Sequence, residues 1–396
     1  MLKINWLACI ILVGLPIFVM GLGIDYASRY DLGWFEFGLF VLGYYGSNIS
    51  VGVGLHRLWS HGAYKTNKVV EFILVMMSAG TLQGPVLAWA SDHYRHHTHT
   101  DKELDPHSPL KYKNRIVGFL WSHIGWMLLG EGSYKNIDKV TIIKLGKNKL
   151  LTWQFKYYVQ IATSMNTVVP FTVGYILGGD IVSAYAGLVF IGLGRALQQE
   201  MTFCINSVSH FMGSKKYYKG TAGDNWWLAP LLLGENWHNF HHAFPSDYRN
   251  GPKWYQFDVH KWIIFGMSKV GLAWDLDRTP EIRVQAKASE TATHFVQGRK
   301  QQLTILQEQL DKLASHFYNK LHELEDSSVL IKQKLQKSFL EIQGSLGELA
   351  QQLQSSIQLA DSDKLLKVTY SKYKETESAI YKLINKFDKL KSRAFS

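Results

Sequence analysis

The sequence predicts an all-α fold: a bundle of four transmembrane helices with a helical cap on its cytoplasmic side, followed by a C-terminal helical, coiled-coil-like extension. Nearly all the long apolar runs lie before about residue 275, and four of them have roughly the 20 residues that a bilayer core requires. Lys and Arg gather in the loops on one side of these runs. The chain after about residue 280 has no Trp and is rich in Gln, Lys, Leu, Ser and Glu.

The averaged composition hides this division. A mean hydropathy of -0.09, with 43 Lys and Arg against 32 Asp and Glu, alone suggests a basic soluble protein. Basic charge also suits nucleic acid, but nucleic-acid-binding proteins do not carry such long apolar runs. No nucleic acid is therefore expected, and a lipid bilayer is the better partner. The cysteines, Cys9 and Cys204, both lie in apolar runs, which excludes a disulfide framework and a cysteine-based zinc cluster.

The expected spans form two hairpins, at about residues 6–27 with 34–55 and 158–177 with 181–208. The first run is too long for a signal peptide and lacks a clear cleavage site. Because Lys and Arg concentrate in the loops around residues 57–68, 95–115 and 135–149, the positive-inside rule places these loops and both termini in the cytoplasm. We expect a multi-pass protein of a bacterial inner membrane rather than of the endoplasmic reticulum.

Two further apolar runs are not expected to cross. Residues 69–90 are long enough, but they lie between two histidine clusters that we expect to share a metal site, and a crossing would put these clusters on opposite faces. Re-entrant backbone is tolerated where protein covers it. Residues 116–130 are too short to span.

Residues 1–280 are expected to form the membrane domain and residues 281–396 a separate hydrophilic tail. A 3-4 spacing of apolar residues there is typical of a coiled coil. The tail is either an oligomerisation or partner-docking module or a solvated appendage without a specific partner. The apolar positions begin with Leu303, Leu306, Leu310, Leu313, Phe317 and Leu324.

Three short histidine clusters, HRLWSH, HYRHH and HNFHH, hold most of the chemistry. In the second and third, the i, i+3, i+4 spacing points three imidazoles to one side of a helix, so each triplet is expected to bind a metal from one face. Two triplets from different segments can enclose two ions. The eight histidines are His56, His61, His93, His96, His97, His238, His241 and His242.

The ligand type limits the metal. Neutral imidazoles suit zinc, copper, iron and nickel rather than magnesium or calcium. Zinc sites usually stop at four ligands, and this supply is double that, which implies two metals. A redox-capable pair beside membrane-buried spans favours oxygen chemistry on a hydrocarbon, with iron as the preferred metal.

These clusters resemble the membrane fatty acid desaturase family, in particular its delta-9 acyl-CoA (stearoyl-CoA) type, over about residues 5–278. The resemblance implies that the helical cap holds two Fe ions (Fe2+/Fe3+), with His210 as a ninth histidine ligand and Asn206 reaching one iron through water. Further matching pieces are Trp89-Ala90-Ser91-Asp92, Asp105-Pro106-His107, Asn206-Ser207-Val208-Ser209-His210, Gly234-Glu235-Asn236-Trp237 and Ala243-Phe244-Pro245.

The resemblance also implies an enzyme that uses O2 and two electrons to place a cis double bond in a saturated fatty acyl chain, with acyl-CoA favoured as substrate. A buried apolar tunnel must hold one pair of carbons by the irons. Family position suggests that Gln83 and Trp89 line the acyl chain, although ordinary packing is an equal alternative. Asp92, Asp105 and Glu235 are candidate acceptors for imidazole N–H groups, or simple surface or capping carboxylates.

Other polar residues are expected to play smaller parts. Five basic loop residues either meet the phosphates of a CoA or a phospholipid head group or are ordinary cytoplasmic charge: Arg57, Arg95, Lys111, Lys113 and Arg115. His99, His107 and His123 lie outside the cluster spacing and are interpreted as non-ligands. Four more histidines are expected to be solvated: His260, His294, His316 and His322.

Electrons must come from a separate protein, because the sequence has neither a haem-binding His-Pro-Gly-Gly pattern nor a dinucleotide fingerprint after a strand. A basic face suits an acidic carrier such as a ferredoxin, or a cytochrome b5-like protein with its reductase.

Three alternatives stay open: a di-iron hydroxylase of lipids or hydrocarbons, a non-catalytic metal-binding membrane scaffold, and a metal transporter. A transporter needs ionisable groups within its spans, where Glu200 near Arg195 is the main case. The sequence leaves open whether the acyl carrier is CoA, phospholipid or a carrier protein.

Overall fold

The computed structural model describes residues 3–130 and 133–295, together with isolated positions further on. By contacts the chain divides into two units, Met1–Thr291 and Ala292–Ser396. The apolar heptad positions lie almost entirely outside the described residues, so the coiled coil stays a prediction. The boundary near residue 280 also stays a prediction, and the first unit runs to Thr291.

Four helices in the described part of the chain are long and apolar enough to cross a membrane: Trp6–Arg29, Trp34–Ser60, Tyr158–Gly178 and Ile181–Phe211. The predicted all-α class with four spans is therefore confirmed. The first contains α1 (Trp6–Cys9), η1 (Ile10–Gly14) and α2 (Leu15–Arg29), and the second α3 (Trp34–Ile49) and η2 (Ser50–Ser60). The third contains α10 (Tyr158–Asn166) and α11 (Val168–Gly178), and the fourth α12 (Ile181–Ala186), η5 (Gly187–Ile191), α13 (Gly192–Asn206) and α14 (Val208–Phe211).

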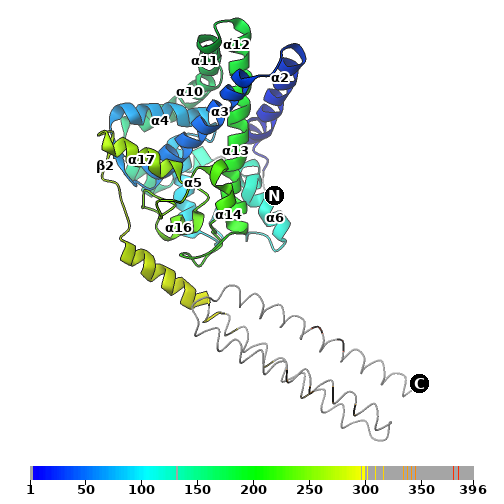
Figure 1. Cartoon of the computed structure of the whole chain (residues 1–396), viewed down its shortest axis with the longest axis vertical. Coiled ribbons are helices and arrows are strands. Elements are labelled where there is room, and N and C mark those ends of the chain that lie inside the picture. Colours follow the sequence, from blue (N-terminus) through cyan, green and yellow to red (C-terminus); the bar gives the residue numbers. More distant parts are fainter. Residues whose placement is uncertain are drawn as a thin grey trace, which may run out of the picture. The chain divides into compact units, whose positions relative to one another are not determined.

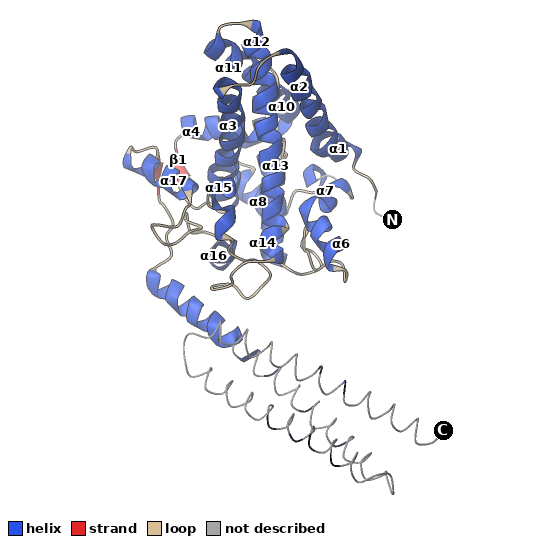
Figure 2. Ribbon diagram, turned by 45° about the vertical axis from the view of Figure 1, so that its right-hand side comes forward, coloured by secondary structure: helices blue, strands red, loops and turns tan. Residues whose placement is uncertain are grey.

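Small residues let these helices approach closely. α3 and α13 lie side by side along the bundle (Figure 1, Figure 2). A Cβ atom at Gly194 would come within 2.1 Å of the Phe40 carbonyl oxygen, and one at Gly43 within 2.2 Å of the Ile191 carbonyl oxygen. Glycine at such contacts is typical of helix packing in membranes, where close backbone approach gains dispersion energy.

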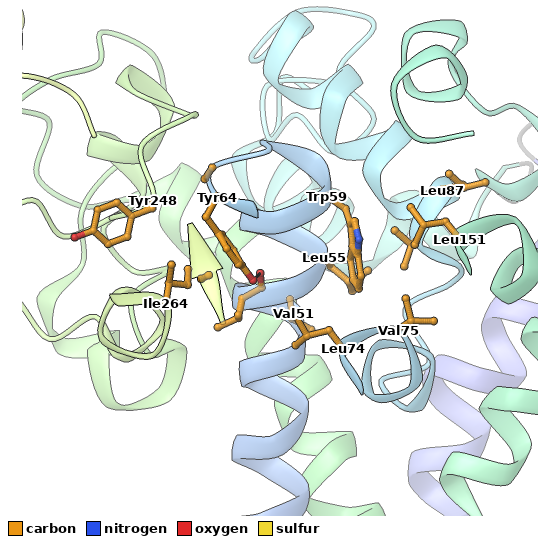
Figure 3. Packing of buried hydrophobic residues seen from close by; sticks show 14 residues of the cluster. Val51, Leu55, Trp59, Tyr64, Leu74, Val75, Leu87, Leu151, Tyr248 and Ile264 are labelled. Atoms are coloured by element: carbon orange, nitrogen blue, oxygen red, sulfur yellow. Dashed lines mark hydrogen bonds between the residues drawn. The ribbon is translucent and has the colours of Figure 1, made fainter. Parts of the chain in front are cut away.

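Residues 69–90 form two helices joined by a turn rather than a single span. α4 (Lys68–Gly80) and α5 (Val86–His99) are joined by a tight turn in which Leu82 and Gly84 have positive φ, at 58° and 97°. Buried apolar side chains of both helices pack against the end of η2. Figure 3 shows Tyr64 and Ile264 on one side of that helix and Val75 and Leu151 on the other.

Short elements complete the histidine-bearing end of the bundle. Residues 116–130 fold as short helices, as expected for a run too short to span. These and the neighbouring elements are α6 (Arg115–Leu120), η3 (Trp121–Gly125), α7 (Trp126–Leu128), η4 (Ser133–Lys135), α8 (Lys139–Leu145), α9 (Lys149–Lys156), η6 (Trp226–Leu228), α15 (Ala229–Leu232), α16 (His238–Ala243) and α17 (Val259–Lys269). The strands β1 (Lys65–Thr66) and β2 (Ala273–Trp274) pair antiparallel.

A helix at residues 281–295 begins after Pro280. Its Val284 is buried against Phe240 and Phe244, and Thr291 Oγ1 donates to the Tyr217 carbonyl at 3.0 Å. Since Phe240 belongs to the third histidine cluster, the first turns of this helix support the histidine-bearing end.

Candidate metal centre

Nine imidazoles meet at one end of the bundle in two groups. The ligand atoms within each group lie within 4.8 Å of one another. The first group has five histidines and the second has four. They are His56, His61, His93, His97 and His241 in the first, and His96, His210, His238 and His242 in the second.

The two triplets are divided between the groups, which differs from the expectation that each triplet binds one metal. On α5, His93 and His97 join the first group and His96 the second. On α16, His241 joins the first group, while His238 and His242 join the second. Each helix therefore contributes to both groups, and the two candidate metal positions are held together by shared elements.

The π-helix η2 brings the first histidine cluster into register. The His61 backbone N–H donates to the His56 carbonyl at 3.2 Å, which is the i to i+5 bond of a π turn. The wider turn places two histidines five residues apart on the same side of the helix. Such local π geometry is frequent at functional sites.

Within each of the two groups, the Nε2 atoms of neighbouring imidazoles lie 2.8 to 3.2 Å apart. Two nitrogens that share a metal at about 2.1 Å have this separation. Burial, followed by the neighbouring imidazoles, lowers the pKa of His93, His97 and His242 well below the usual range. Burial also lowers the pKa of His238 to about 3. These imidazoles are therefore neutral at physiological pH, the form that binds metal.

Glu235 is the centre of a buried ionic network behind His56. Its carboxylate oxygens lie 2.7 Å from His56 Nδ1 and 2.9 Å from His260 Nδ1, and it pairs with Arg57 at 3.0 Å. Arg57 also pairs with Asp258 at 2.9 Å. Although burial opposes ionisation, His56 and Arg57 hold the pKa of Glu235 well below its usual range. The carboxylate can therefore fix the His56 ring and its tautomer.

Two further acidic groups support the second set of histidines. Asp105 Oδ1 lies 2.9 Å from His96 Nδ1. Thr221 Oγ1 lies 2.7 Å from His210 Nδ1, and Asp101 in turn accepts hydrogen bonds from the Thr221 hydroxyl and, at 2.7 Å, from its backbone N–H. Sequence reasoning missed Asp101 and Thr221, because neither lies in a histidine cluster.

The backbone around the third cluster is shaped by two polar side chains, the buried Asn239 and the half-buried Asp224. The Asn239 side-chain oxygen accepts three backbone N–H groups, from Lys216, Tyr217 and Tyr218. Asp224 accepts the Asn239 backbone N–H at 2.7 Å. The loop before α16 is thereby fixed to the helix that carries the histidines.

The other predicted site residues lie near these groups. Asn206 ends α13, one helical turn before His210. Trp89 Nε1 donates to Gln83 Oε1 at 3.2 Å, and Gln83 Nε2 faces Thr202 Oγ1 at 3.4 Å, so the two candidate acyl contacts form one hydrogen-bonded unit. Asp92 lies 3.6 Å from Arg95.

Two expectations about the remaining charged residues are wrong. His260 is fully buried rather than solvated, and Arg57 is buried and ion-paired, so it does not face a CoA phosphate. His107 is buried, stacked on His96 at a centroid distance of 4.1 Å, and lies in a third potential ligand group with His96 and Asp105, so its interpretation as a non-ligand stays a prediction. Sequence spacing gave no signal for these three burials.

Two other histidines can be placed. His123 lies 2.9 Å from Ser207 Oγ and 3.5 Å from Glu200, so Glu200 faces His123, while Arg195 bonds Gln199. His99 belongs to none of the ligand groups found among the described residues, and His294 is exposed. His316 and His322 lie outside the described residues.

Comparison with known proteins identifies the family of the chain. The family model for fatty acid desaturase matches residues 32–268. A probable acyl-CoA desaturase of Schizosaccharomyces pombe is 33% identical over 286 residues, which cover 71% of this chain and 56% of the relative. Acyl-CoA desaturase 1 of Saccharomyces cerevisiae is 33% identical over 279 residues, 69% of this chain and 52% of the relative.

A bacterial relative is covered more fully. The hex-5-enoyl-[acyl-carrier protein] acetylenase of Moorena producens is 31% identical over 274 residues, 65% of this chain and 82% of the relative. The chain spans about half the length of the two yeast relatives. Its four apolar helices and these relatives make it a membrane protein. By its family-model match and its relatives, the chain belongs to the fatty acid desaturase family.

Proposed function

We propose that the chain is an O2-dependent di-iron desaturase that places a cis double bond, at delta-9, in a saturated fatty acyl chain. The single observation that carries the proposal is the convergence of nine imidazoles in two adjacent groups. Neutral imidazole in this number suits a redox-active first-row metal. The relatives named as acyl-CoA desaturases favour acyl-CoA as substrate.

The donor set fits two iron ions. The five-histidine group would hold one, and the four-histidine group the other, and Asn206 would reach one of them through water. When bound, the two irons supply the oxidising power, with O2 and electrons, that an unactivated C–H bond requires. The overall reaction takes two hydrogens from neighbouring carbons and, with two further electrons and two protons, converts O2 to two waters.

Buried carboxylates of the chain orient the histidine rings for metal binding. An imidazole that donates its Nδ1 proton to a carboxylate keeps the Nε2 lone pair free for metal. Glu235 lies 2.7 Å from His56 Nδ1 and Asp105 lies 2.9 Å from His96 Nδ1, so each carboxylate is placed to accept such a proton. Because these carboxylates are themselves buried, the rings cannot turn without breaking ionic contacts.

Gln83 and Trp89 would orient the substrate. Their hydrogen bond fixes both side chains at the turn between α4 and α5, the helix that carries the second histidine cluster. Fixing the acyl chain there would present one pair of carbons to the metal centre, and such positioning determines the position of the double bond.

The remaining parts of the proposal concern the membrane orientation, the electron donor and the tail. The histidine-bearing end would face the cytoplasm of a bacterial cell, where a ferredoxin, or a cytochrome b5-like protein with its reductase, supplies electrons to a basic surface. The tail after residue 291 would serve oligomerisation or a partner.

Expression in a host without its own desaturase tests the proposal. Mass spectrometry of the acyl pool, separated into CoA, phospholipid and carrier-protein esters, should find a cis double bond at delta-9 only when the chain is expressed. His96→Ala serves as the matched control. Hydroxylated chains without an alkene would overturn the desaturase in favour of a hydroxylase.

A further inference from the structure

A buried cation lies near the middle of the fourth span. Arg195 belongs to α13, within the helix Ile181–Phe211, and its relative exposure is 3%. A guanidinium group at this depth is costly unless an anion or several hydrogen-bond acceptors face it. An ionisable residue inside a span is for this reason a candidate functional site.

The protein supplies few of these acceptors. Arg195 Nη1 donates to Gln199 Oε1 at 3.3 Å, and its Nε atom has no partner. Among the described residues, no carboxylate forms an ion pair with it. Glu200, the acid nearest in sequence, lies by His123 instead. Four of the five guanidinium N–H groups therefore have no hydrogen bond to the described part of the chain.

An unused acceptor lies three residues further along the same helix face. Gln198 is 1% exposed, and its Oε1 atom has no partner, although its Nε2 donates to Thr202 Oγ1 at 2.6 Å. A ligand group that carries an oxygen and a hydroxyl proton would satisfy both residues. A methyl group would satisfy neither and would leave buried polar atoms unpaired, which is unfavourable.

The position of Arg195 relates it to the acyl chain. Arg195, Gln198, Thr202 and Asn206 recur at three- or four-residue intervals, so they lie on one face of the helix. Thr202 contacts Gln83, the candidate acyl contact. Arg195 lies two helical turns, about 10 Å, beyond Thr202 and away from the histidines. That distance is comparable with the part of a long acyl chain beyond its middle carbons.

We propose that Arg195 binds an oxygen-bearing group, a hydroxyl or a carboxylate, at the end of the acyl chain remote from the thioester. A hydroxyl would also donate to Gln198 Oε1, whereas a carboxylate would pair with Arg195 alone. This inference rests on the proposed function, because it takes Gln83 as an acyl contact. Sites with buried, unpaired polar groups discriminate strongly against analogues that lack the matching group. The preferred substrates are therefore acyl chains with a polar distal end.

Binding to the full-length, iron-free chain in nanodiscs tests the proposal without any turnover. Calorimetry compares three probes: hexadecanoyl-CoA, 16-hydroxyhexadecanoyl-CoA and the CoA monothioester of hexadecanedioic acid. The wild-type chain should bind at least one oxygenated probe tenfold or more tightly than hexadecanoyl-CoA. A preference for the hydroxyl or for the carboxylate probe identifies the group.

Arg195→Met should abolish that preference and keep the affinity for hexadecanoyl-CoA. Arg195→Lys keeps the charge but loses the planar set of guanidinium donors, so it should reduce the preference. This second variant keeps the test decisive if Arg195→Met does not fold. Leu197→Met, at a 42% exposed position of the same helix, is the control and should leave it unchanged.

Equal binding of the three probes by the wild-type chain, or an unchanged preference in both Arg195 variants, overturns the inference and leaves the proposed desaturase intact. If none of the three acyl-CoA probes binds, both the proposed acyl-CoA substrate and the inference about Arg195 are contradicted. Desaturation of hexadecanoyl-CoA by the iron-loaded chain, measured separately, shows which of the two has failed.

Discussion

Replacing Glu235 by Gln tests whether the carboxylates behind the histidines hold the metals in place. Glu235 contacts His56 and His260 at 2.7 and 2.9 Å and pairs with Arg57 at 3.0 Å. Glutamine keeps the size of the side chain and one oxygen acceptor. It loses the charge, and its amide nitrogen cannot accept a proton from an imidazole. The His56 ring therefore loses part of what fixes its tautomer and direction.

The expected loss follows from this contact. Removing a group that orients a metal-bound histidine weakens metal affinity roughly 10- to 100-fold, which corresponds to about 1–3 kcal/mol. The fold should survive, because Arg57 keeps Asp258 at 2.9 Å and is not left unpaired. A buried charge left without any partner would cost about 3–5 kcal/mol.

Iron retention is the assay. The iron-to-protein ratio is measured as a chelator is added, with Glu290→Gln as the control. Glu290 is exposed and pairs with Lys219 and Lys287 at the surface, where ion pairs contribute little. Glu235→Gln should lose iron at a lower chelator concentration than the wild type, and Glu290→Gln should match the wild type. Equal retention in all three proteins would refute the role given to Glu235.

Three further predictions concern the ligands, the helix at residues 281–295 and pH. His96→Ala and His241→Ala, each of which removes one imidazole from a different group, should both lower bound iron and abolish the unsaturated product. Unsaturated product in either variant would favour a non-catalytic scaffold. Val284→Asp places a charge in the apolar contact with Phe240 and should destabilise the chain by about 3 kcal/mol or more in thermal unfolding. Ile282→Asp, at a 77% exposed position, should be nearly neutral, and equal effects of the two would contradict the packing role. Burial raises the pKa of Asp224 from 3.8 to about 7, so the folded chain holds this proton more tightly than the unfolded chain. Stability should therefore fall as pH rises between these values, and Asp224→Asn should flatten that part of the pH profile.

The spans were predictable because their signal is local. A run of roughly twenty apolar residues has few other stable placements, and the four predicted runs match four observed helices. The exclusion of residues 69–90 needed a second argument, the shared histidines, since length alone allows a crossing. The structure shows a turn after α4, in which Leu82 and Gly84 both have positive φ. This turn lets the chain come back to the side of the membrane on which the first histidine cluster lies, as the shared metal site requires.

The supporting network was not predictable, because its members come from distant parts of the chain. More than a hundred residues of sequence separate Arg57 from its two partners, Glu235 and Asp258. No regular spacing in the sequence indicates that these three residues meet. His260, on α17, has no neighbouring histidine and looked solvated. Its burial depends on η2: a Cβ atom at Gly52 would lie 2.0 Å from the His260 ring, so only glycine allows this close approach.

The division of each histidine triplet between two metal groups follows from helix geometry. At about 100° per residue, positions i and i+4 differ by about 40° around the axis, whereas i+3 lies on the other side of i. His93 and His97 therefore point toward one group and His96 toward the other, and α16 repeats the rule with His238 and His242 against His241. In the first cluster, histidines five residues apart would diverge on an α-helix. The π turn between His56 and His61 brings them together, so a two-metal centre requires η2 to be wound in this way.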